Sequence, residues 1–214
     1  MLVGNRMTHN PITVTPDISI AEAMEKMTRE KVHRFPVVDK DRKLVGIVSH
    51  YDLVHASPSS ATSLSMWEIS YLLAQIKVGE VMTKKVITTT EDTPLEEAAR
   101  LMADSSIGGL PVVRDGLLVG IITESDLFRV FLEIFGAREK GIRLTVLAPY
   151  VKGSMAKITS TITNAGGLIV AFDTFLGDDP SNWGATIKVS DITTDKLLEV
   201  IKPLVVEIVD VREV

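Results

Sequence analysis

The sequence contains one segment twice, and this duplication restricts the possible folds more than any other feature of the chain. Three blocks recur in the same order: residues 7–14, 35–38 and 46–53 return as residues 82–89, 110–113 and 120–127. The first two blocks return 75 residues downstream and the third returns 74 residues downstream, so the second copy is one residue shorter between Val113 and Gly120. A repeat of this length is a duplicated small domain, and two such copies tend to pack about a pseudo-two-fold axis. Any cleft between the copies is then expected to occur twice.

The first copy is predicted to fold as strand, helix, strand, strand and helix. The β-branched run at residues 11–15 predicts the first strand. The capping box Ser19-x-x-Glu22, followed by apolar residues at helical spacing, predicts the first helix. Residues 35–38 and 44–48 are predicted to be strands on either side of a polar turn.

The second copy repeats these elements with small changes. Pro94 stands in the first turn of its first helix, where no N–H group is needed. The turn between its two strands, at residues 114–116, is one residue shorter, which a hairpin tolerates. A last helix is predicted from Glu124 to about Phe135.

The segment between the copies is predicted to contain a loop and a helix. Residues 57–63 are mostly serine, proline and threonine, which is typical of a loop. Ser65-x-x-Glu68 then begins a helix that extends to about Ile76. Five apolar residues of this helix are expected to form its packing face: Trp67, Ile69, Leu72, Leu73 and Ile76.

The pattern changes after a short hydrophilic linker at residues 136–141, which has glycine at both ends. Strands are predicted at residues 142–148, 168–176, 183–189 and from 205 onward, with helices from Ser154 to Gly166 and at residues 193–201. Met155, Ile158 and Ile162 are expected on the buried face of the first of these helices. The order βαββαβ is that of a ferredoxin-like sandwich, with helices on one face of an antiparallel sheet. The predicted fold class is α/β, and more narrowly α+β.

Composition excludes several classes of function. The chain has 214 residues, of which 45% are hydrophobic, and this is ample for packed cores. The absence of cysteine excludes disulfides, thiolate metal sites and thiol nucleophiles. A net charge of −5 without a basic stripe argues against nucleic acid as a partner. Residues 1–6 lack an apolar signal core and no apolar run is long enough for a membrane span, so we expect a cytoplasmic protein.

Catalytic and metal motifs are not recognisable in the sequence. The four histidines lack the spacing of metal ligands. The serines lack the Gly-x-Ser-x-Gly elbow, and no glycine-rich phosphate loop is present. We therefore expect no enzymatic activity, no catalytic cofactor and no metal site.

The duplicated half resembles a pair of cystathionine-β-synthase (CBS) domains, which form the regulatory Bateman module. The resemblance rests on the Leu/Phe-Pro-Val-Val strand and on the segment Gly-hydrophobic-hydrophobic-Ser/Thr-x-x-Asp-Leu, each present twice between about Met7 and Phe131. The C-terminal part resembles an ACT domain in its topology and in Gly153 and Gly166-Gly167. The order CBS–CBS–ACT is similar to the acetoin-utilisation accessory protein family. The resemblance implies these boundaries: first CBS domain 1–60, connecting loop and helix 61–78, second CBS domain 79–135, linker 136–141 and ACT-like domain 142–214.

In the CBS family, the Ser/Thr-x-x-Asp segment lies where a strand meets a helix, and its chemistry suits a nucleotide. An aspartate can accept two hydrogen bonds from ribose hydroxyls, while a hydroxyl group and helix-start N–H groups suit phosphate. The resemblance assigns these roles to Ser49 and Asp52 in the first copy and to Thr123 and Asp126 in the second.

Thr13 and Thr88, in the first strand of each copy, would contribute backbone and apolar contacts to the base. An alternative stays open, in which Ser49 and Thr123 are only helix N-caps and the aspartates only complement the helix dipole. The occurrence of the pattern in both copies favours ligand binding.

The two copies differ just before the Pro-Val-Val strand, where the first has His33-Arg34 and the second has Gly108-Gly109. In nucleotide-binding members of the family, basic residues at this place meet phosphates. Arg34 can contact a phosphate through two donors and His33 can donate or carry partial charge, whereas glycine lets a ligand approach the backbone. We expect two unequal clefts, one for a charged phosphate tail and one for a neutral or smaller adenosyl group. The sequence does not decide which cleft receives Arg34, and a solvated basic strand start is the alternative.

The resemblance to ACT domains implies a possible amino-acid site between subunits. Gly153 fits the glycine loop after the first strand of such domains. Binding members often have asparagine where this chain has Leu168, and leucine cannot hydrogen-bond a carboxylate or an amine. Asn164 is near in sequence but stands at a helix end, where it can serve as a C-terminal cap. We therefore favour a structural or dimerising role for this domain.

These features predict a non-catalytic, ligand-responsive regulatory protein. The CBS pair would bind ATP, ADP, AMP or another adenosyl compound, and a homodimer would act on a regulated protein that the sequence does not identify. Two alternatives stay open: an amino-acid sensor that works through the ACT-like domain, and an interaction scaffold that binds no small ligand.

Overall fold

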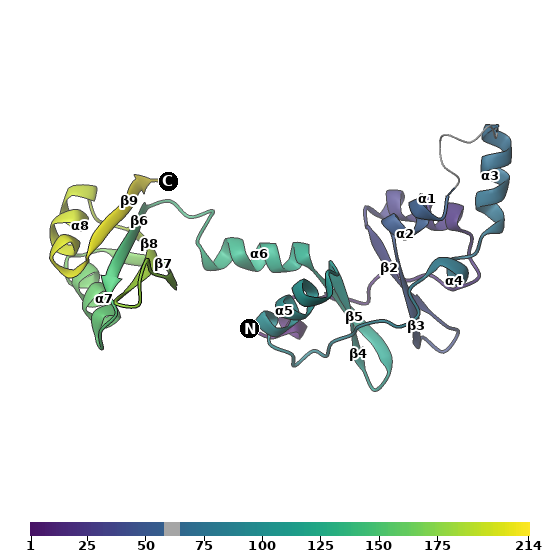
Figure 1. Cartoon of the computed structure of the whole chain (residues 1–214), viewed down its shortest axis with the longest axis horizontal. Helices are drawn as coiled ribbons and strands as arrows, with labels where there is room; N and C mark the ends of the chain where they lie inside the picture. Colours follow the sequence, from purple (N-terminus) through teal and green to yellow (C-terminus); the bar gives the residue numbers. More distant parts are fainter. Residues whose placement is uncertain (58–64) are drawn as a thin grey trace. The chain divides into compact units, whose positions relative to one another are not determined.

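The computed structural model describes residues 1–57 and 65–214. The chain divides into an N-terminal unit, Met1–Leu127, and a C-terminal unit, Phe128–Val214. The N-terminal unit contains both copies of the repeat apart from the end of the last helix, and the C-terminal unit contains a four-stranded sheet (Figure 1). The part of the predicted interrepeat loop that follows Ser57 lies outside the described residues up to position 64.

The first copy forms two helices around a β-hairpin. Its elements are a 3-10 turn (Val3–Asn5), β1 (Thr8–His9), α1 (Ile20–Glu30), β2 (Arg34–Val38), β3 (Leu44–Ser49) and α2 (His50–His55). The predicted capping box begins α1, because the Ser19 hydroxyl accepts the Glu22 N–H group at 3.2 Å and the Glu22 carboxylate accepts the Ser19 N–H group at 2.8 Å. Four of the five residues of β2 are buried, as the short apolar run at residues 35–38 predicts.

The second copy repeats the helix, the two strands and the helix of the first copy in the same order. They are α5 (Leu95–Ser105), β4 (Gly109–Arg114), β5 (Leu117–Thr123) and α6 (Glu124–Ile134). Both hairpins have a register shift at the equivalent place, between Val37 and Val38 and between Val112 and Val113. Helix α6 begins in the N-terminal unit and continues into the C-terminal unit.

The short segment that precedes each copy packs on the other copy. Strand β1 pairs antiparallel with β5, and the Val3 N–H group donates to the Thr93 carbonyl at 2.9 Å. At the equivalent place 75 residues later, the Val78 N–H group donates to the Ile18 carbonyl at 2.9 Å. Residues 1–9 therefore belong structurally with the second copy and residues 77–83 with the first.

Two methionine–glycine contacts show the same crossing. A Cβ atom on Gly120 would collide with the side chain of Met7, and a Cβ atom on Gly46 would collide with the side chain of Met82. The glycines recur in the repeat because a methionine of the opposite copy occupies this space. These paired contacts are the pseudo-two-fold relation that the duplication predicts.

The predicted strand at residues 11–15 is wrong for most of its length. The regular pairing lies earlier, in β1, and only Val14 forms an isolated parallel bridge, with Val37. Asn10 has a positive φ of 46° and Pro11 has no N–H group, so the backbone turns and cannot continue the β1 ladder. Thr89 of the second copy makes the matching bridge, with Val112.

Two helices connect the copies, α3 (Met66–Gln75) and α4 (Val78–Val81). Helix α3 begins at the predicted Ser65-x-x-Glu68 capping box. Leu73 and Ile76 pack against the core of the first copy as expected. Trp67, which was expected on the packing face, is 88% exposed, and Leu72 is also exposed. The five predicted residues extend around more of the helix than the one face that contacts the described part of the chain.

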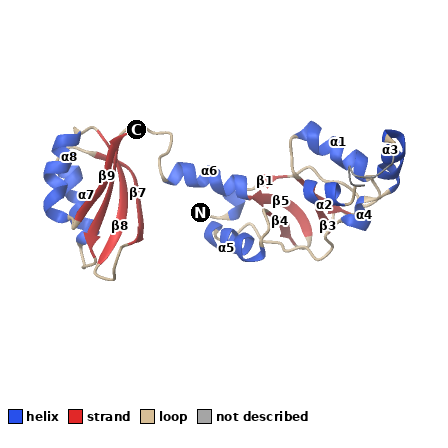
Figure 2. Cartoon of the chain, turned by 45° about the horizontal axis from the view of Figure 1, so that its top comes forward, coloured by secondary structure: helices blue, strands red, loops and turns tan. Residues whose placement is uncertain are grey.

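The C-terminal unit is an antiparallel sheet with two helices. Its elements are β6 (Ile142–Pro149), α7 (Ser154–Asn164), β7 (Leu168–Leu176), β8 (Asn182–Ser190), α8 (Thr194–Ile201), a 3-10 turn (Lys202–Leu204) and β9 (Glu207–Glu213). The strand order β7-β8-β6-β9 is that of a ferredoxin-like sandwich, as predicted. Helices α7 and α8 lie on one face of this sheet (Figure 2).

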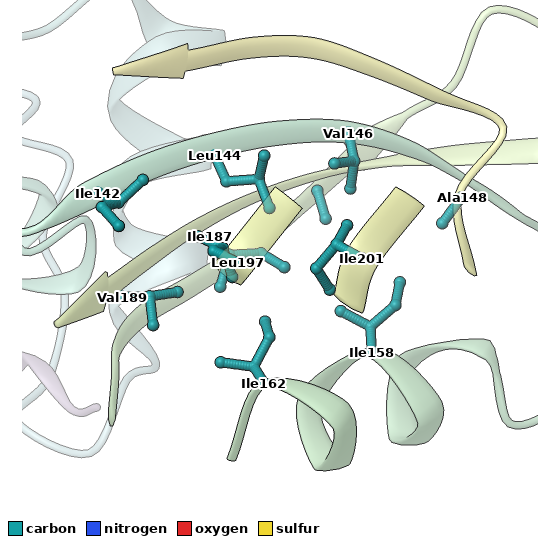
Figure 3. Packing of buried hydrophobic residues seen from close by; sticks show 11 residues of the cluster. Ile142, Leu144, Val146, Ala148, Ile158, Ile162, Ile187, Val189, Leu197 and Ile201 are labelled. Carbon is teal, nitrogen blue, oxygen red and sulfur yellow. The ribbon is translucent and has the colours of Figure 1, made fainter. Parts of the chain in front are cut away.

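The core of the C-terminal unit lies between the sheet and these helices. Ile158 and Ile162 of α7 point toward Leu197 and Ile201 of α8 and toward Ile187 of the sheet (Figure 3). All five side chains are fully buried.

Met155, which was also expected inside, is 48% exposed. It lies in the first turn of α7, one residue after Ser154. The position continues the helical spacing of Ile158 and Ile162, so the spacing alone gave no sign that the core ends before this turn.

We predict that Ile158→Ala lowers the free energy of unfolding of the C-terminal unit by about 2–5 kcal/mol, because it leaves a cavity in this core. The matched control is Met155→Ala on the same helix, which should cost less than about 1 kcal/mol at a half-exposed position. Hydrogen exchange of β6–β9 with increasing denaturant measures both. Equal effects of the two variants would contradict the assigned helix face.

Residues 136–141, predicted as a linker, are held to the C-terminal unit. The Lys188 ammonium is buried, with 6% of the residue exposed, and donates to the Gly136 carbonyl at 2.8 Å and to the Glu139 carbonyl at 2.6 Å. Gly141 and Val214 exchange two backbone hydrogen bonds of 3.0 and 2.9 Å. The segment is therefore an ordered part of this unit, which disfavours a hinge within it.

We predict that Lys188→Met lowers the stability of this segment by about 1–3 kcal/mol, because two carbonyl groups lose their charged donor. Lys196→Met is the control, since Lys196 is exposed and its pair with Glu199 contributes about 0–1 kcal/mol. Hydrogen exchange at residues 136–141 should rise in the first variant only. An unchanged exchange rate would show that Lys188 does not hold the segment.

Candidate functional site

The first candidate site lies where β3 meets α2. Ser49 has an extended backbone and is the N-cap of α2. Its N–H group and its hydroxyl group both donate to Oδ2 of Asp52 at 2.7 Å, and its Oγ accepts the Asp52 N–H group at 3.3 Å. Arg34 is the direct cross-strand partner of Ser49. The fold thus brings Arg34, Ser49 and Asp52 to one end of the β2–β3 hairpin.

The second candidate site repeats this geometry where β5 meets α6. The Thr123 N–H and hydroxyl groups donate to Oδ2 of Asp126 at 2.9 and 2.7 Å. Gly109 is the cross-strand partner of Thr123, in the place that Arg34 has in the first copy. Asp126 is 6% exposed and is among the few buried polar residues of the described chain.

The N-cap interpretation explains the hydrogen bonds within each Ser/Thr-x-x-Asp segment, because the same hydrogen bonds begin α1 and α3. In those helices the acidic residue is a glutamate, Glu22 or Glu68, and it is exposed. Hydrogen bonds from the Ser19 N–H and hydroxyl groups lower the pKa of Glu22, and bonds from the Ser65 hydroxyl and N–H groups lower the pKa of Glu68. The two junctions differ from these caps, because their shorter aspartates are partly or fully buried at the ends of the paired hairpins.

Arg34 lies over the glycines of the opposite copy. A Cβ atom on Gly108 would be 2.6 Å from Arg34 Nη2, and one on Gly109 would be 3.1 Å from Arg34 Nη1. The sequence difference between His33-Arg34 and Gly108-Gly109 therefore has a packing reason. The glycines leave the space that the arginine of the first copy occupies, and this answers which copy receives Arg34.

Two carboxylates act on the Arg34 charge. Oε2 of Glu124 would be 2.8 Å from the same Cβ position on Gly108, so it lies close to the guanidinium. Burial lowers the pKa of Arg34 from its usual value, while the charges of Glu124 and Asp52 oppose this shift. Arg34 thus interacts with the Asp52 junction of its own copy and with Glu124 at the start of α6.

The remaining predicted residues, His33, Thr13 and Thr88, lie outside the two capping pairs. The His33 carbonyl accepts the His50 N–H group at 2.8 Å, while the His33 side chain is exposed. Thr13 and Thr88 each stand one residue before the isolated bridge to the hairpin of their own copy. The Thr13 carbonyl accepts Lys26 Nζ at 2.9 Å, so this group already has a partner.

Sequence reasoning missed Glu124. It follows Thr123 directly and was counted only as the first residue of a helix. Its signal was the comparison of the copies, because the equivalent residue of the first copy is His50. The two copies therefore differ in charge on both sides of the junction, at Glu124 as well as at Gly108-Gly109.

The candidate amino-acid residues of the C-terminal unit do not meet within one chain. Gly153 precedes α7 with a positive φ of 84°, and Asn164 is the last residue of that helix. At 1.5 Å per residue the two lie about 16 Å apart along the helix axis. Leu168 begins β7 and is exposed. A site that uses both ends of α7 would need a second chain.

Two kinds of functional feature are absent from residues 1–57 and 65–214. No group of three or more His, Asp or Glu side chains there could hold a metal ion. No helix there is long and apolar enough to cross a membrane.

Comparison with known proteins identifies the duplicated half. The family model for the CBS domain matches residues 3–59 and 78–133, which is more than half of the chain. A CBS domain-containing protein of Dictyostelium discoideum is 32% identical over 135 residues, which cover 63% of this chain and 93% of that protein. The L-aspartate semialdehyde sulfurtransferase of Methanocaldococcus jannaschii is 36% identical over 133 residues, 61% of this chain, but this chain spans only 23% of the enzyme.

Solved structures show the same fold for this half. A CBS domain pair in complex with 5′-methylthioadenosine and S-adenosyl-L-methionine has a TM-score of 0.52 at 32% identity and covers 65% of this chain and 98% of that one. A putative acetoin utilization protein from Vibrio cholerae has a TM-score of 0.54 at 32% identity, with 64% and 95% covered. The protein CBSX2 in complex with AMP has a TM-score of 0.54 at 36% identity, with 62% and 97% covered.

The family match covers the two copies of the repeat and ends at residue 133, so the ferredoxin-like sandwich from β6 onward lies outside it. The repeated Pro-Val-Val and Ser/Thr-x-x-Asp blocks, the crossed packing of the copies and the family match lead to one assignment. The chain belongs to the CBS domain family, with a tandem pair of these domains in its N-terminal unit.

Proposed function

We propose that this protein is a non-catalytic regulator whose CBS pair binds an adenosyl ligand at the two strand-to-helix junctions. The observation that carries the proposal is the duplicated pair Ser49–Asp52 and Thr123–Asp126, each with an aspartate Oδ2 already held by a hydroxyl and an N–H group. Similar CBS pairs have been solved with AMP and with adenosyl thioether and sulfonium compounds, which supports this ligand class.

The geometry suits the ribose. One oxygen of each aspartate holds the cap, and a carboxylate is a group that can accept several hydrogen bonds, as the two ribose hydroxyls require. A bound ribose would thus add bonds to a side chain that the cap has already oriented, which lowers the entropy cost of binding.

Regulation would follow from a change in the arrangement of the two copies. A ligand shifts such an equilibrium only through different affinities for two arrangements. Helix α6 is the element through which a shift can reach the rest of the chain, because it starts at Thr123 and continues into the C-terminal unit. The regulated protein is a separate partner.

For the C-terminal unit we propose an ACT-like role in dimerisation. Its ferredoxin-like strand order and the glycine before α7 favour this identity. An amino-acid sensor is the second candidate, and exposed Leu168 at the start of β7 argues against it. A thermal-shift screen with the twenty amino acids separates the two, because a clear shift of the full chain would favour the sensor.

Isothermal titration calorimetry of the full chain with AMP, ATP, 5′-methylthioadenosine and S-adenosylmethionine tests the ligand class. We expect saturable binding of at least one compound, with two unequal sites or one site per chain. The absence of binding for all four would favour the scaffold alternative and overturn the proposal.

A further inference from the structure

The two junctions carry different charges, although their capping geometry is the same. In the first copy the residues around the junction are His33, Arg34 and His50, whereas the second copy has Gly108, Gly109 and Glu124 at the equivalent places. Because Arg34 crosses to the glycines, the junction of the second copy contains one guanidinium and the Glu124 carboxylate beside it. A ligand at Asp126 that reached Arg34 would therefore also meet the negative charge of Glu124.

The position of Glu124 relative to the ligand junction follows from the backbone. The Glu124 N–H group donates to the Gly108 carbonyl at 3.2 Å, and the residue stands two positions before Asp126 in the first turn of α6. Arg34 and Glu124 both lie against Gly108. A ligand group that reaches Gly108 from Asp126 would therefore meet a guanidinium and a carboxylate together.

We infer that Glu124 makes the second junction select adenosyl ligands with a neutral or cationic 5′ group over those with a 5′ phosphate. This inference rests on the proposed adenosyl function and names its ligand class. A phosphate would need the donors of Arg34, but it would also approach the negative charge of Glu124 beside them. A thioether or sulfonium group meets no such repulsion, and a sulfonium is attracted by the carboxylate.

AMP and 5′-methylthioadenosine are the sharpest pair of probes, because they share adenosine and differ in the 5′ group. Calorimetry with the wild-type chain should show 5′-methylthioadenosine binding at least about tenfold more tightly than AMP. Glu124→Gln keeps the size of the side chain and removes its charge. It should tighten AMP about tenfold and leave 5′-methylthioadenosine within about twofold.

Glu97→Gln is the matched control, since Glu97 is an exposed carboxylate in the first turn of α5, and it should leave the ratio of the two affinities unchanged. The inference is overturned if wild-type protein binds AMP as tightly as 5′-methylthioadenosine, or if Glu124→Gln leaves that ratio unchanged. If neither compound nor S-adenosylmethionine binds, the proposed function falls together with the inference. Binding with equal affinities overturns the inference alone.

Discussion

Asp126→Ala is expected to weaken the adenosyl ligand at the second junction about 100-fold. The aspartate is buried and would accept two charge-assisted hydrogen bonds from the ribose, and the loss of such a pair costs about 3 kcal/mol. The junction at Asp52 should keep its affinity, because Asp52 makes its own capping bonds to Ser49. Calorimetry should therefore show the loss of one site and the retention of the other.

This experiment must distinguish the effect of losing the N-cap from the effect of losing the ligand contact. Asp126→Ala also removes the hydrogen bonds to Thr123, which should lower stability by about 1 kcal/mol. Glu68→Ala removes the same kind of cap from α3 and should lower stability without changing affinity. Asp126→Asn keeps an acceptor for the cap and should still weaken the ligand. Equal affinity in wild type and Asp126→Asn would leave the aspartate as an N-cap only.

Deletion of residues 1–9 is expected to destabilise the second copy of the repeat, although the deleted segment adjoins the first copy in sequence. The segment supplies β1 to the edge of β5 and buries Val3 and Met7. Each buried side chain contributes about 1.5–3 kcal/mol, so the total loss is about 3–6 kcal/mol. Hydrogen exchange should rise first in β5 and α5, while β2 and β3 keep their protection.

Two milder variants test the same crossed packing in case the deletion unfolds the whole unit. Val3→Ala and Val78→Ala change equivalent, fully buried positions, and each should cost about 2 kcal/mol. Val3→Ala should loosen the second copy, whereas Val78→Ala should loosen the first, because Val78 lies in the core of that copy. If each substitution loosened the copy that follows it in sequence, the crossed arrangement would be wrong.

The elements of the repeat and of the C-terminal sandwich could be predicted because their signals are local. The Ser19-x-x-Glu22 box begins α1, and the alternation of apolar residues marks the strands of the ferredoxin-like sheet. The strand at residues 11–15 failed for an equally local reason, since neither the positive φ of Asn10 nor the lack of a pairing partner is visible in a β-branched run.

The crossing of the copies could not be read from periodicity, because it depends on which surfaces meet. One local sign of the crossing is the recurrence of the pairs Met7–Gly120 and Met82–Gly46. Each glycine makes room for a methionine of the other copy. The placement of Arg34 over Gly108 is the same kind of fact. A comparison of the copies shows that His33-Arg34 and Gly108-Gly109 differ. Only the fold shows the reason, which is that Arg34 lies against these glycines.

The central claim is that the two junctions hold adenosyl ligands, and native mass spectrometry of the full chain tests it most directly. Wild-type protein should retain or take up an adenosyl compound at up to two molecules per chain, among AMP, ATP, 5′-methylthioadenosine and S-adenosylmethionine. The double variant Asp52→Asn, Asp126→Asn should lose that added mass while it keeps the oligomeric state of the wild type. An adenosyl ligand that stays bound to the double variant, or no adenosyl mass on the wild type with any of these compounds, would contradict the account.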